Sequence, residues 1–388
     1  MKHFGKVVMA AFCVFLYVGC KKITVSEMDR ISITDPASFV DVAFEDVATD
    51  IRVVPLISEE PIDQCGEIKC YGKETFIRSV DRRTLYYFNE GQMISKLNRV
   101  GRGPGEYLTI SNFVFSPNRK ILYLFSSGDN SIFQFSVPEM RFLKSIKVEQ
   151  MTCFAEHDDS TLIVRSNING ENGIYFINAN NGEIMGKLKD ISGFSLSFNE
   201  KMDFYQPKHR ILSEIGSTNI ISEIPRKVGD EERLLFVYDF GQSGIPKEYD
   251  DCSLYNITSL MRLMQYVRQN SDNVYVGGFC CKADKNAISF WYRRINTENK
   301  ADMRFYWTDG KNTKRYGGFR LSAMRNPIVP DCVTDDGYAS ILEGSPEFLF
   351  DSQQSFSSIS AEIKQVVSTQ KNEQSGFNLL SYKVVCMA

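Results

Sequence analysis

The segment Thr109–Ile146, TISNFVFSPNRKILYLFSSGDNSIFQFSVPEMRFLKSI, contains four short apolar or alternating runs separated by tight turns. The runs are Thr109–Phe115, Lys120–Phe125, Ser131–Ser136 and Arg141–Ile146. The breaks between them are Pro117-Asn118, Gly128-Asp129-Asn130 and Pro138-Glu139. These residue types supply the fixed or positive φ that a tight reversal of the chain needs. The segment therefore predicts one four-stranded antiparallel sheet.

Similar sets of short strands recur on both sides of this segment. One set precedes it, at Glu74–Val80, Thr84–Phe88 and Gln92–Leu97, and one follows it, at Thr152–His157, Thr161–Ser166, Gly173–Ile177 and Ile184–Leu188. Fourth and fifth sets are expected at Ile211–Ile224 with Arg233–Phe240, and at Asn273–Cys281, Ala287–Ile295 and Met303–Thr308. Four-stranded units repeated every roughly 40–55 residues are typical of a β-propeller, in which each unit is a blade.

The last set explains how the ring closes. Ile328–Thr334, Gly337–Glu343 and Phe377–Val385 give only three strands of a sixth blade, and Ser355–Thr369 has the periodicity of an inserted helix. Asp50–Ile57 is a strand without a blade at the other end of the chain. We expect it to be the outer strand of the last blade, a position that also tolerates Pro55. The prediction is an all-β, six-bladed propeller closed by its N-terminal strand.

The connector Gly101–Tyr107 (GRGPGEY) has an echo in Gly241–Tyr249 (GQSGIPKEY). Neither is a Walker loop, because no Lys-Ser/Thr pair follows the glycines and no helix follows the loop. One interpretation is structural, with glycines at positive φ, Pro104 stiffening the loop, Glu106 accepting backbone N–H groups and Tyr107 packing. The other is functional, because loops between blades open on one face around the channel mouth. The candidate binding residues on that face are Arg102, Glu106, Tyr107, Lys247, Glu248 and Tyr249.

The N-terminus has the pattern of a lipoprotein signal. Lys2 and Lys6 precede an apolar core at Val7–Gly19, which is too short to span a membrane, and Cys20 follows directly. Together with Asp50–Leu56 and the Gly101–Tyr107 loop, this signal resembles the six-bladed propeller lipoproteins of Gram-negative gut anaerobes, distant relatives of NHL-repeat propellers. The resemblance implies a lipid on Cys20 and a cell-envelope location, with the outer membrane expected and the leaflet left open. It implies no catalytic residue.

These features divide the chain into a signal peptide (1–19), a tether and lead-in (20–49) and one propeller domain (50–388). Loss of Lys2 and Lys6 with the signal takes the formal charge from −3 to −5. An acidic chain without basic runs argues against a nucleic-acid partner. The expected partners are the membrane, through the lipid anchor, and an unknown protein, peptide or glycan.

Catalytic and metal-binding signals are sparse. No C-x-x-C pair and no zinc-finger spacing occurs, and the portion after the signal contains only His157 and His209. A calcium site of carboxylates stays open at Asp158-Asp159, Asp309 or Asp335-Asp336, although each also fits a plain turn. His157 itself is expected to end a strand before an acidic turn. No cofactor and no metal ligand is assigned.

The sequence thus favours a lipid-anchored binding or scaffold protein of the envelope over an enzyme. The alternative is a lyase or lactonase-like hydrolase with a carboxylate-bound divalent metal in the propeller channel. A purely structural subunit of an outer-membrane assembly is a third hypothesis.

Overall fold

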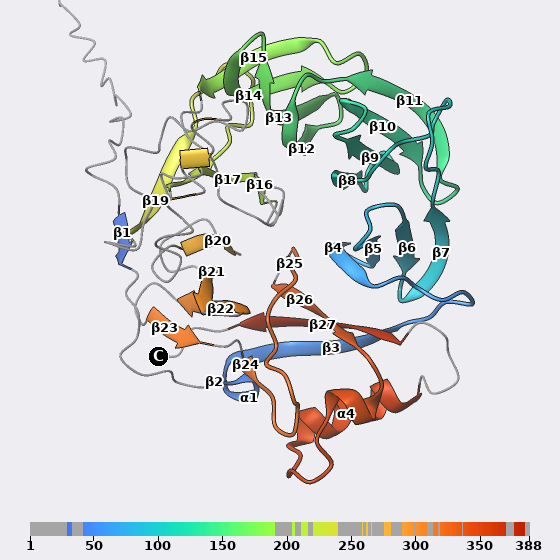
Figure 1. The fold of residues 1–388 in the computed structure, drawn as a ribbon, viewed down its shortest axis with the longest axis vertical. Helices are drawn as coiled ribbons and strands as arrows, with labels where there is room; N and C mark the ends of the chain where they lie inside the picture. The colour runs from blue at the N-terminus through green and yellow to red at the C-terminus, as the bar shows by residue number, and fades with distance from the viewer. Residues whose placement is uncertain are drawn as a thin grey trace, which may run out of the picture.

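The computed structural model describes part of the 388-residue chain. Apart from a few isolated positions, the described residues are 29–32, 42–190, 204–205, 211–215, 220–239, 275–280, 289–297, 300–308, 313–316, 319–335, 337–369 and 376–384. Six sheets of four or more strands stand around a common axis, and a short two-stranded sheet accompanies them (Figure 1). The prediction of an all-β propeller built from four-stranded antiparallel blades is confirmed.

The first three blades follow one plan, in which the chain enters at the inner strand and leaves at the outer strand. The first blade contains β4 (Cys65–Tyr71), β5 (Glu74–Ser79), β6 (Leu85–Asn89) and β7 (Gln92–Leu97). The second contains β8 (Asn112–Ser116), β9 (Ile121–Ser126), β10 (Ser131–Ser136) and β11 (Arg141–Lys147). The third contains β12 (Met151–Asp158), β13 (Thr161–Ile168), β14 (Glu171–Asn178) and β15 (Ile184–Asp190).

The fourth and fifth blades continue the ring. The fourth contains β16 (Phe204–Tyr205), β17 (Leu212–Ile215), β18 (Ile220–Glu223) and β19 (Arg233–Asp239), and β1 (Asp29–Ser32) pairs in parallel with β19. The fifth contains β20 (Tyr275–Cys280), β21 (Ser289–Thr297), β22 (Lys300–Thr308) and β23 (Thr313–Tyr316). The lead-in thus adds a strand to the outer edge of the fourth blade.

The sixth blade is shared between the two ends of the chain, as predicted. It contains β25 (Cys332–Val333), β26 (Tyr338–Glu343), β27 (Phe377–Val384) and β3 (Ala48–Leu56), in that order from the inside. β27 and β3 pair antiparallel from Phe377 opposite Leu56 to Val384 opposite Ala48. Pro55 lies on this outermost strand, where its missing N–H removes no ladder bond.

Burial along the strands follows the stacking of the blades. The middle strands β9 and β10 are buried along almost their whole length, because a neighbouring blade covers each of their faces. The outer strands β7 and β11 alternate between exposed and partly buried positions, because they form the edge of the stack. Blade-to-blade burial of apolar faces is therefore the main stabilising contribution to the ring.

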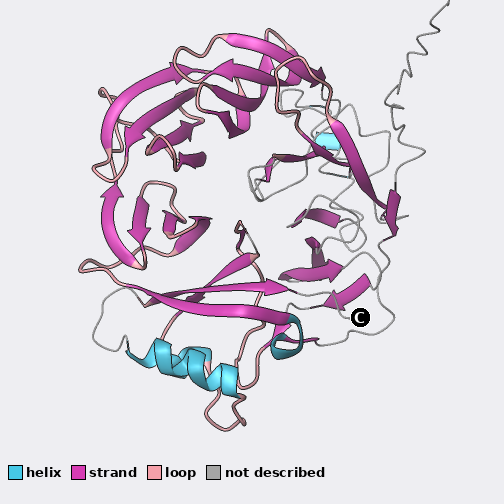
Figure 2. Cartoon of the chain, turned by 180° about the vertical axis from the view of Figure 1, so that it is seen from behind, coloured by secondary structure: helices cyan, strands magenta, loops and turns pink. Residues whose placement is uncertain are grey.

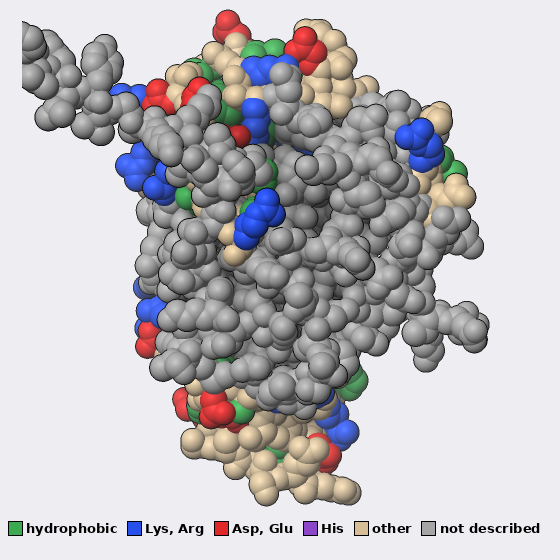
Figure 3. Space-filling model, turned by 90° about the vertical axis from the view of Figure 1, so that its left-hand side faces the viewer, with side chains coloured by type: hydrophobic (Ala, Val, Ile, Leu, Met, Phe, Trp, Pro, Cys, Tyr) green, Lys and Arg blue, Asp and Glu red, His purple; other side chains and the backbone are tan. Residues whose placement is uncertain are grey.

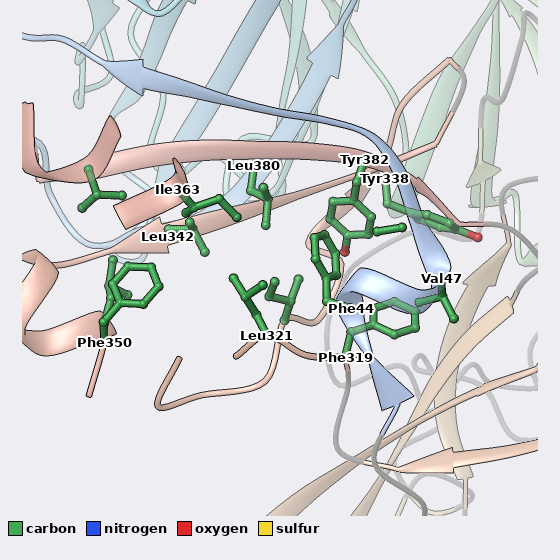
Figure 4. Close-up of a cluster of buried hydrophobic side chains, with 14 residues drawn as sticks. Phe44, Val47, Phe319, Leu321, Tyr338, Leu342, Phe350, Ile363, Leu380 and Tyr382 are labelled. Atoms are coloured by element: carbon green, nitrogen blue, oxygen red, sulfur yellow. The ribbon is translucent and has the colours of Figure 1, made fainter. Parts of the chain in front are cut away.

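Three helices lie beside the sixth blade and outside the ring (Figure 2). They are α1 (Phe44–Val47), α3 (Pro346–Leu349) and α4 (Ser358–Thr369), the last confirming the predicted inserted helix. Phe44 of α1 packs edge-on against Tyr382 of β27, with ring centroids 4.9 Å apart (Figure 4). Ile363 and Val367 of α4 belong to the same buried cluster. A further short sheet pairs β2 (Val42–Ala43) with β24 (Phe319–Arg320).

Residues 42–47, inside the predicted lead-in, are thus packed against the sixth blade, and residues 48–49 are already part of its strand β3. The proposed limits of the signal, tether and propeller stay predictions. Among the described helices, none is long and apolar enough to cross a membrane.

Candidate functional site

The connector Gly101–Tyr107 joins β7, the outer strand of the first blade, to β8, the inner strand of the second. Gly105 has a φ of +77°, a conformation that side chains with a Cβ rarely adopt. A Cβ at Gly105 would also lie 2.6 Å from Cγ of Phe142 on β11. The loop therefore presses directly on the second blade, and glycine is required at this position for both reasons.

Glu106 fixes the first half of the loop. Its Oε2 accepts a hydrogen bond of 2.7 Å from the backbone N–H of Gly103. A Cβ at Gly101 would lie 2.0 Å from the same oxygen, so the carboxylate lies directly over the bare glycine backbone. The predicted structural role of Glu106, accepting backbone N–H groups, is confirmed.

Tyr107 is fully buried, with no exposed side-chain surface. Its ring packs edge-on against Phe133 and Phe135 of β10, and its hydroxyl lies 2.9 Å from the carbonyl oxygen of Arg83 and 3.1 Å from that of Leu97. Burial raises the pKa of Tyr107 to about 12. The structure gives Tyr107 a packing role, as the structural interpretation of the loop predicted. Arg102 and Glu106 are exposed, so contact between them and a ligand stays a prediction.

The second connector, with Lys247, Glu248 and Tyr249, lies outside the described residues. The expectation that both connectors open on the same face of the ring therefore also stays a prediction.

A charged cluster on the first blade was not predicted from the sequence. Glu67 of β4 and Arg78 of β5 are both almost fully buried, and Arg78 Nε donates to Glu67 Oε2 at 3.1 Å. Arg78 Nη1 also donates to the carbonyl oxygen of Ile110 at 2.9 Å. Lys69 Nζ lies 3.6 Å from Glu67 Oε1, so two cations share one carboxylate.

Lys69 links this charged cluster to the second blade through hydrogen bonds. Its Nζ donates to Asn112 Oδ1 at 3.1 Å and to the carbonyl oxygen of Phe113 at 2.6 Å, both on β8. Burial lowers the pKa of Lys69, and the Glu67 carboxylate opposes that shift. Both β4 and β8 are innermost strands, so the cluster fastens two blades together close to the ring axis (Figure 1).

A sequence signal for this cluster exists in retrospect. Glu67 and Lys69 alternate with Ile68 and Cys70, which belong to the apolar contact with the sixth blade. Period-two alternation of charged and apolar residues is compatible with a strand whose two faces meet different neighbours.

His157 is the second-last residue of β12, which ends at Asp158, one residue later than predicted, before the Asp159-Ser160 turn. Its Nε2 lies 2.8 Å from the carbonyl oxygen of Pro225, and its Nδ1 lies 3.0 Å from Asp158 Oδ2. Asp158 Oδ1 accepts the Ser160 backbone N–H at 2.8 Å, as an aspartate in a tight turn does. Within the described residues, no group of three or more His, Cys, Asp or Glu side chains is placed to hold a metal ion. Asp309 and Asp336 lie outside them, and the metal-dependent alternative stays a prediction.

Charges of both signs are present on the face that Figure 3 shows. Described Lys and Arg side chains and described Asp and Glu side chains occur at its upper and lower ends, close to one another.

The fold and sequence together identify the family. A family model described as a six-bladed β-propeller matches residues 22–250. The chain belongs to this family. The six sheets in the ring agree with that description, and the resemblance to six-bladed propellers that the sequence suggested is confirmed.

One solved structure supports the same fold at low sequence identity. A Bacteroides fragilis protein described as exported is 16% identical, with a TM-score of 0.64, and the match covers 92% of this chain and 100% of that one. A Bacteroides vulgatus protein that is assigned to a different family is 9% identical with a TM-score of 0.47, and the match covers 88% of this chain and 98% of that one. No curated protein matches the sequence.

Proposed function

We propose that this propeller is an exported binding or scaffold protein, held in the cell envelope by a lipid on Cys20. Three features support export and anchoring: the basic start at Lys2 and Lys6, the short apolar core Val7–Gly19, and the cysteine that follows it. The structural relative from Bacteroides fragilis is itself described as exported. Acylation of Cys20 together with a second chain on the same residue would suffice for stable anchoring.

The single observation that carries the binding role is the set of internal contacts that hold the Gly101–Tyr107 loop. The side chain of Tyr107 is fully buried beneath the loop, and Glu106 accepts a hydrogen bond from the backbone N–H of Gly103. Arg102 and Pro104 are exposed on this supported loop. A rigid loop loses little conformational entropy when it binds, so its exposed residues can contribute more of their contact energy to affinity.

The ligand that suits this surface is a peptide or a glycan. A single exposed guanidinium beside an exposed carboxylate offers both donors and acceptors, whereas a polyanion would require several cations together. The loop face, with Arg102 and Glu106, is therefore the surface on which a ligand is expected.

Binding is tested by screening the mature protein against arrayed envelope glycans and peptides. Any hit is then measured with Arg102→Ala, and with Arg141→Ala as the matched control, because Arg141 is an exposed arginine on the outer strand β11. We expect Arg102→Ala to weaken binding at least about tenfold and Arg141→Ala to leave it unchanged. Equal affinities for the two variants would contradict the loop face, and an array without any hit would contradict this ligand class.

Anchoring has a separate test. Wild-type protein and Cys20→Ala are expressed with radiolabelled palmitate, and the membrane fraction is collected. The wild type should carry label and sediment with membranes, and Cys20→Ala should do neither. Label that survives in Cys20→Ala would refute the anchor.

A further inference from the structure

The N-terminal and C-terminal parts of the propeller make two contacts where the ring closes. One is a strand pair within the sixth blade, and the other joins the sixth blade to the first. At the outer edge, β27 and β3 form a long antiparallel ladder, with an ion pair of 2.8 Å between Lys383 and Asp50. At the inner edge, β25 contains only Cys332 and Val333, and it lies beside β4 of the first blade. The inner edge of the closure is therefore a contact between strands of two different sheets, without the ladder that joins the outer edge.

One cysteine from each side stands at this inner edge. The Cys332 thiol donates a weak hydrogen bond to the Cys70 sulfur, with 3.7 Å between the two Sγ atoms. The two residues are 262 positions apart in the sequence. Cys332 is buried at 2% exposure in the apolar contact between the sixth and first blades, and Cys70 is partly exposed beside it.

This separation is within reach of a covalent bond. A disulfide has an S–S length of about 2.05 Å, so the sulfurs must approach by roughly 1.7 Å, which side-chain rotation combined with a small strand shift can provide. Cys65, the other cysteine of β4, is not an alternative partner for Cys70. β4 is continuous from Cys65 to Tyr71, and five residues of extended chain separate their Cα atoms by roughly 16 Å.

We propose that Cys70 and Cys332 form a disulfide in the exported protein, which joins the innermost strands of the first and last blades and locks the ring. The inference rests on the proposed export, because an oxidising compartment is required. The oxidant is a disulfide-bearing compound or thiol oxidoreductase of that compartment. The Cys70 thiolate attacks its disulfide and releases one thiol, and the Cys332 thiolate then attacks Cys70 Sγ and releases the second. Two electrons and two protons leave the cysteine pair.

The disulfide would stabilise the closed ring. Linking residues 262 positions apart restricts the unfolded chain strongly, since loop-closure entropy increases with loop length. It would also hold the short strand β25 against β4 when the outer ladder opens.

Peptide mapping of the purified mature protein, oxidised with oxidised glutathione, tests the pairing. Trypsin cleaves after Lys69 and Lys73, so Cys70 and Cys65 fall on different peptides. We expect residues 70–73 linked to the peptide that contains Cys332, and a thermal midpoint that falls by roughly 5 °C on reduction. Cys65→Ser, the matched control on the same strand, should keep both results, and Cys70→Ser should lose both while remaining folded.

The outcomes separate this inference from the proposed export. If the linked peptide does not form in the purified protein, or Cys70 pairs with another cysteine, the pairing is wrong. If it forms in the purified protein but both thiols react with N-ethylmaleimide when acid-quenched native cells are returned to neutral pH under denaturing conditions, the geometry holds and the bond in the cell is refuted. Export is judged independently of this result, by the labelled, membrane-bound Cys20.

Discussion

The Gly101–Tyr107 loop gives the sharpest test of the structure, through the substitution Gly105→Ala. Two costs are expected. The first is conformational, since a φ of +77° costs a residue with a Cβ roughly 1–2 kcal/mol. The second is steric, since the added Cβ would lie 2.6 Å from Phe142 Cγ and 2.7 Å from Phe142 Cβ. Rotation of the Phe142 ring moves Cγ but not Cβ, so the loop or β11 must shift, at a further cost of about 1–3 kcal/mol.

Gly72→Ala isolates the first cost. Gly72 has a φ of +60°, and a Cβ there would meet no atom within 4 Å. We therefore expect Gly72→Ala to lower the free energy of unfolding by about 1–2 kcal/mol, and Gly105→Ala to lower it by about 2–5 kcal/mol.

Urea denaturation followed by tryptophan fluorescence and circular dichroism measures both losses, with the slopes required to match before the values are compared. A double-mutant cycle with Phe142→Ala adds a second check. Because Phe142→Ala removes Cγ and leaves Cβ, it should recover part of the steric loss, so that the two substitutions together cost less than the sum of each alone. Equal losses for Gly105→Ala and Gly72→Ala, or strictly additive losses in the cycle, would refute the packing of the loop on the second blade.

Three other predictions concern buried groups. Tyr107→Phe should cost about 1–2 kcal/mol at pH 8 by urea denaturation. The pKa of Tyr107 is raised in the folded state from 10.0 to about 12. The stability that its hydroxyl contributes is therefore present below pH 10 and is lost as the pH rises to about 12. If the free energies of unfolding of the wild type and the variant change in parallel over that range, this prediction is contradicted. Glu67→Gln leaves two buried cations without their carboxylate and should lower the free energy of unfolding by about 3–5 kcal/mol. The control Glu60→Gln breaks an exposed ion pair and should lower it by less than about 1 kcal/mol. Similar urea midpoints for the two variants would show that the cluster does not stabilise the fold. Phe44→Ala should lower the free energy of unfolding by about 3–5 kcal/mol, because Phe44 is fully buried. Phe348 is 63% exposed, so Phe348→Ala should change it by less than about 0.5 kcal/mol. A small loss for Phe44→Ala would mean that α1 is not part of the core.

Much of the fold could be predicted from local patterns. Ser131–Ser136 and Gln92–Leu97 were predicted to the residue, because turn residues bound each strand on both sides. The ring closure followed from counting, since Asp50–Ile57 had no blade of its own, and it is confirmed by β3. The helix Ser355–Thr369 begins three residues later than predicted, at Ser358, a difference ordinary for helix ends.

Among the blade strands, the sequence reasoning missed β4, β16 and β23. β4 contains Glu67 and Lys69, and charged residues near glycine resemble a loop when the chain is read alone. They are tolerated in a buried strand because Arg78 and Asn112, from other strands, supply their partners. Those partners are identified only by the way the first two blades stack.

The sequence by itself determined the class of fold, the blade repeat, the closure by the N-terminal strand and the structural role of Glu106 in the Gly101–Tyr107 loop. Period-two alternation and turn residues are local properties, and each blade forms largely from neighbouring strands, so they can be recognised along the chain. Only the tertiary structure showed that Tyr107 is buried and that Cys70 lies 3.7 Å from Cys332. These contacts join segments far apart in sequence, and they exist only when the blades stack and the ring closes, which leaves no local pattern in the sequence.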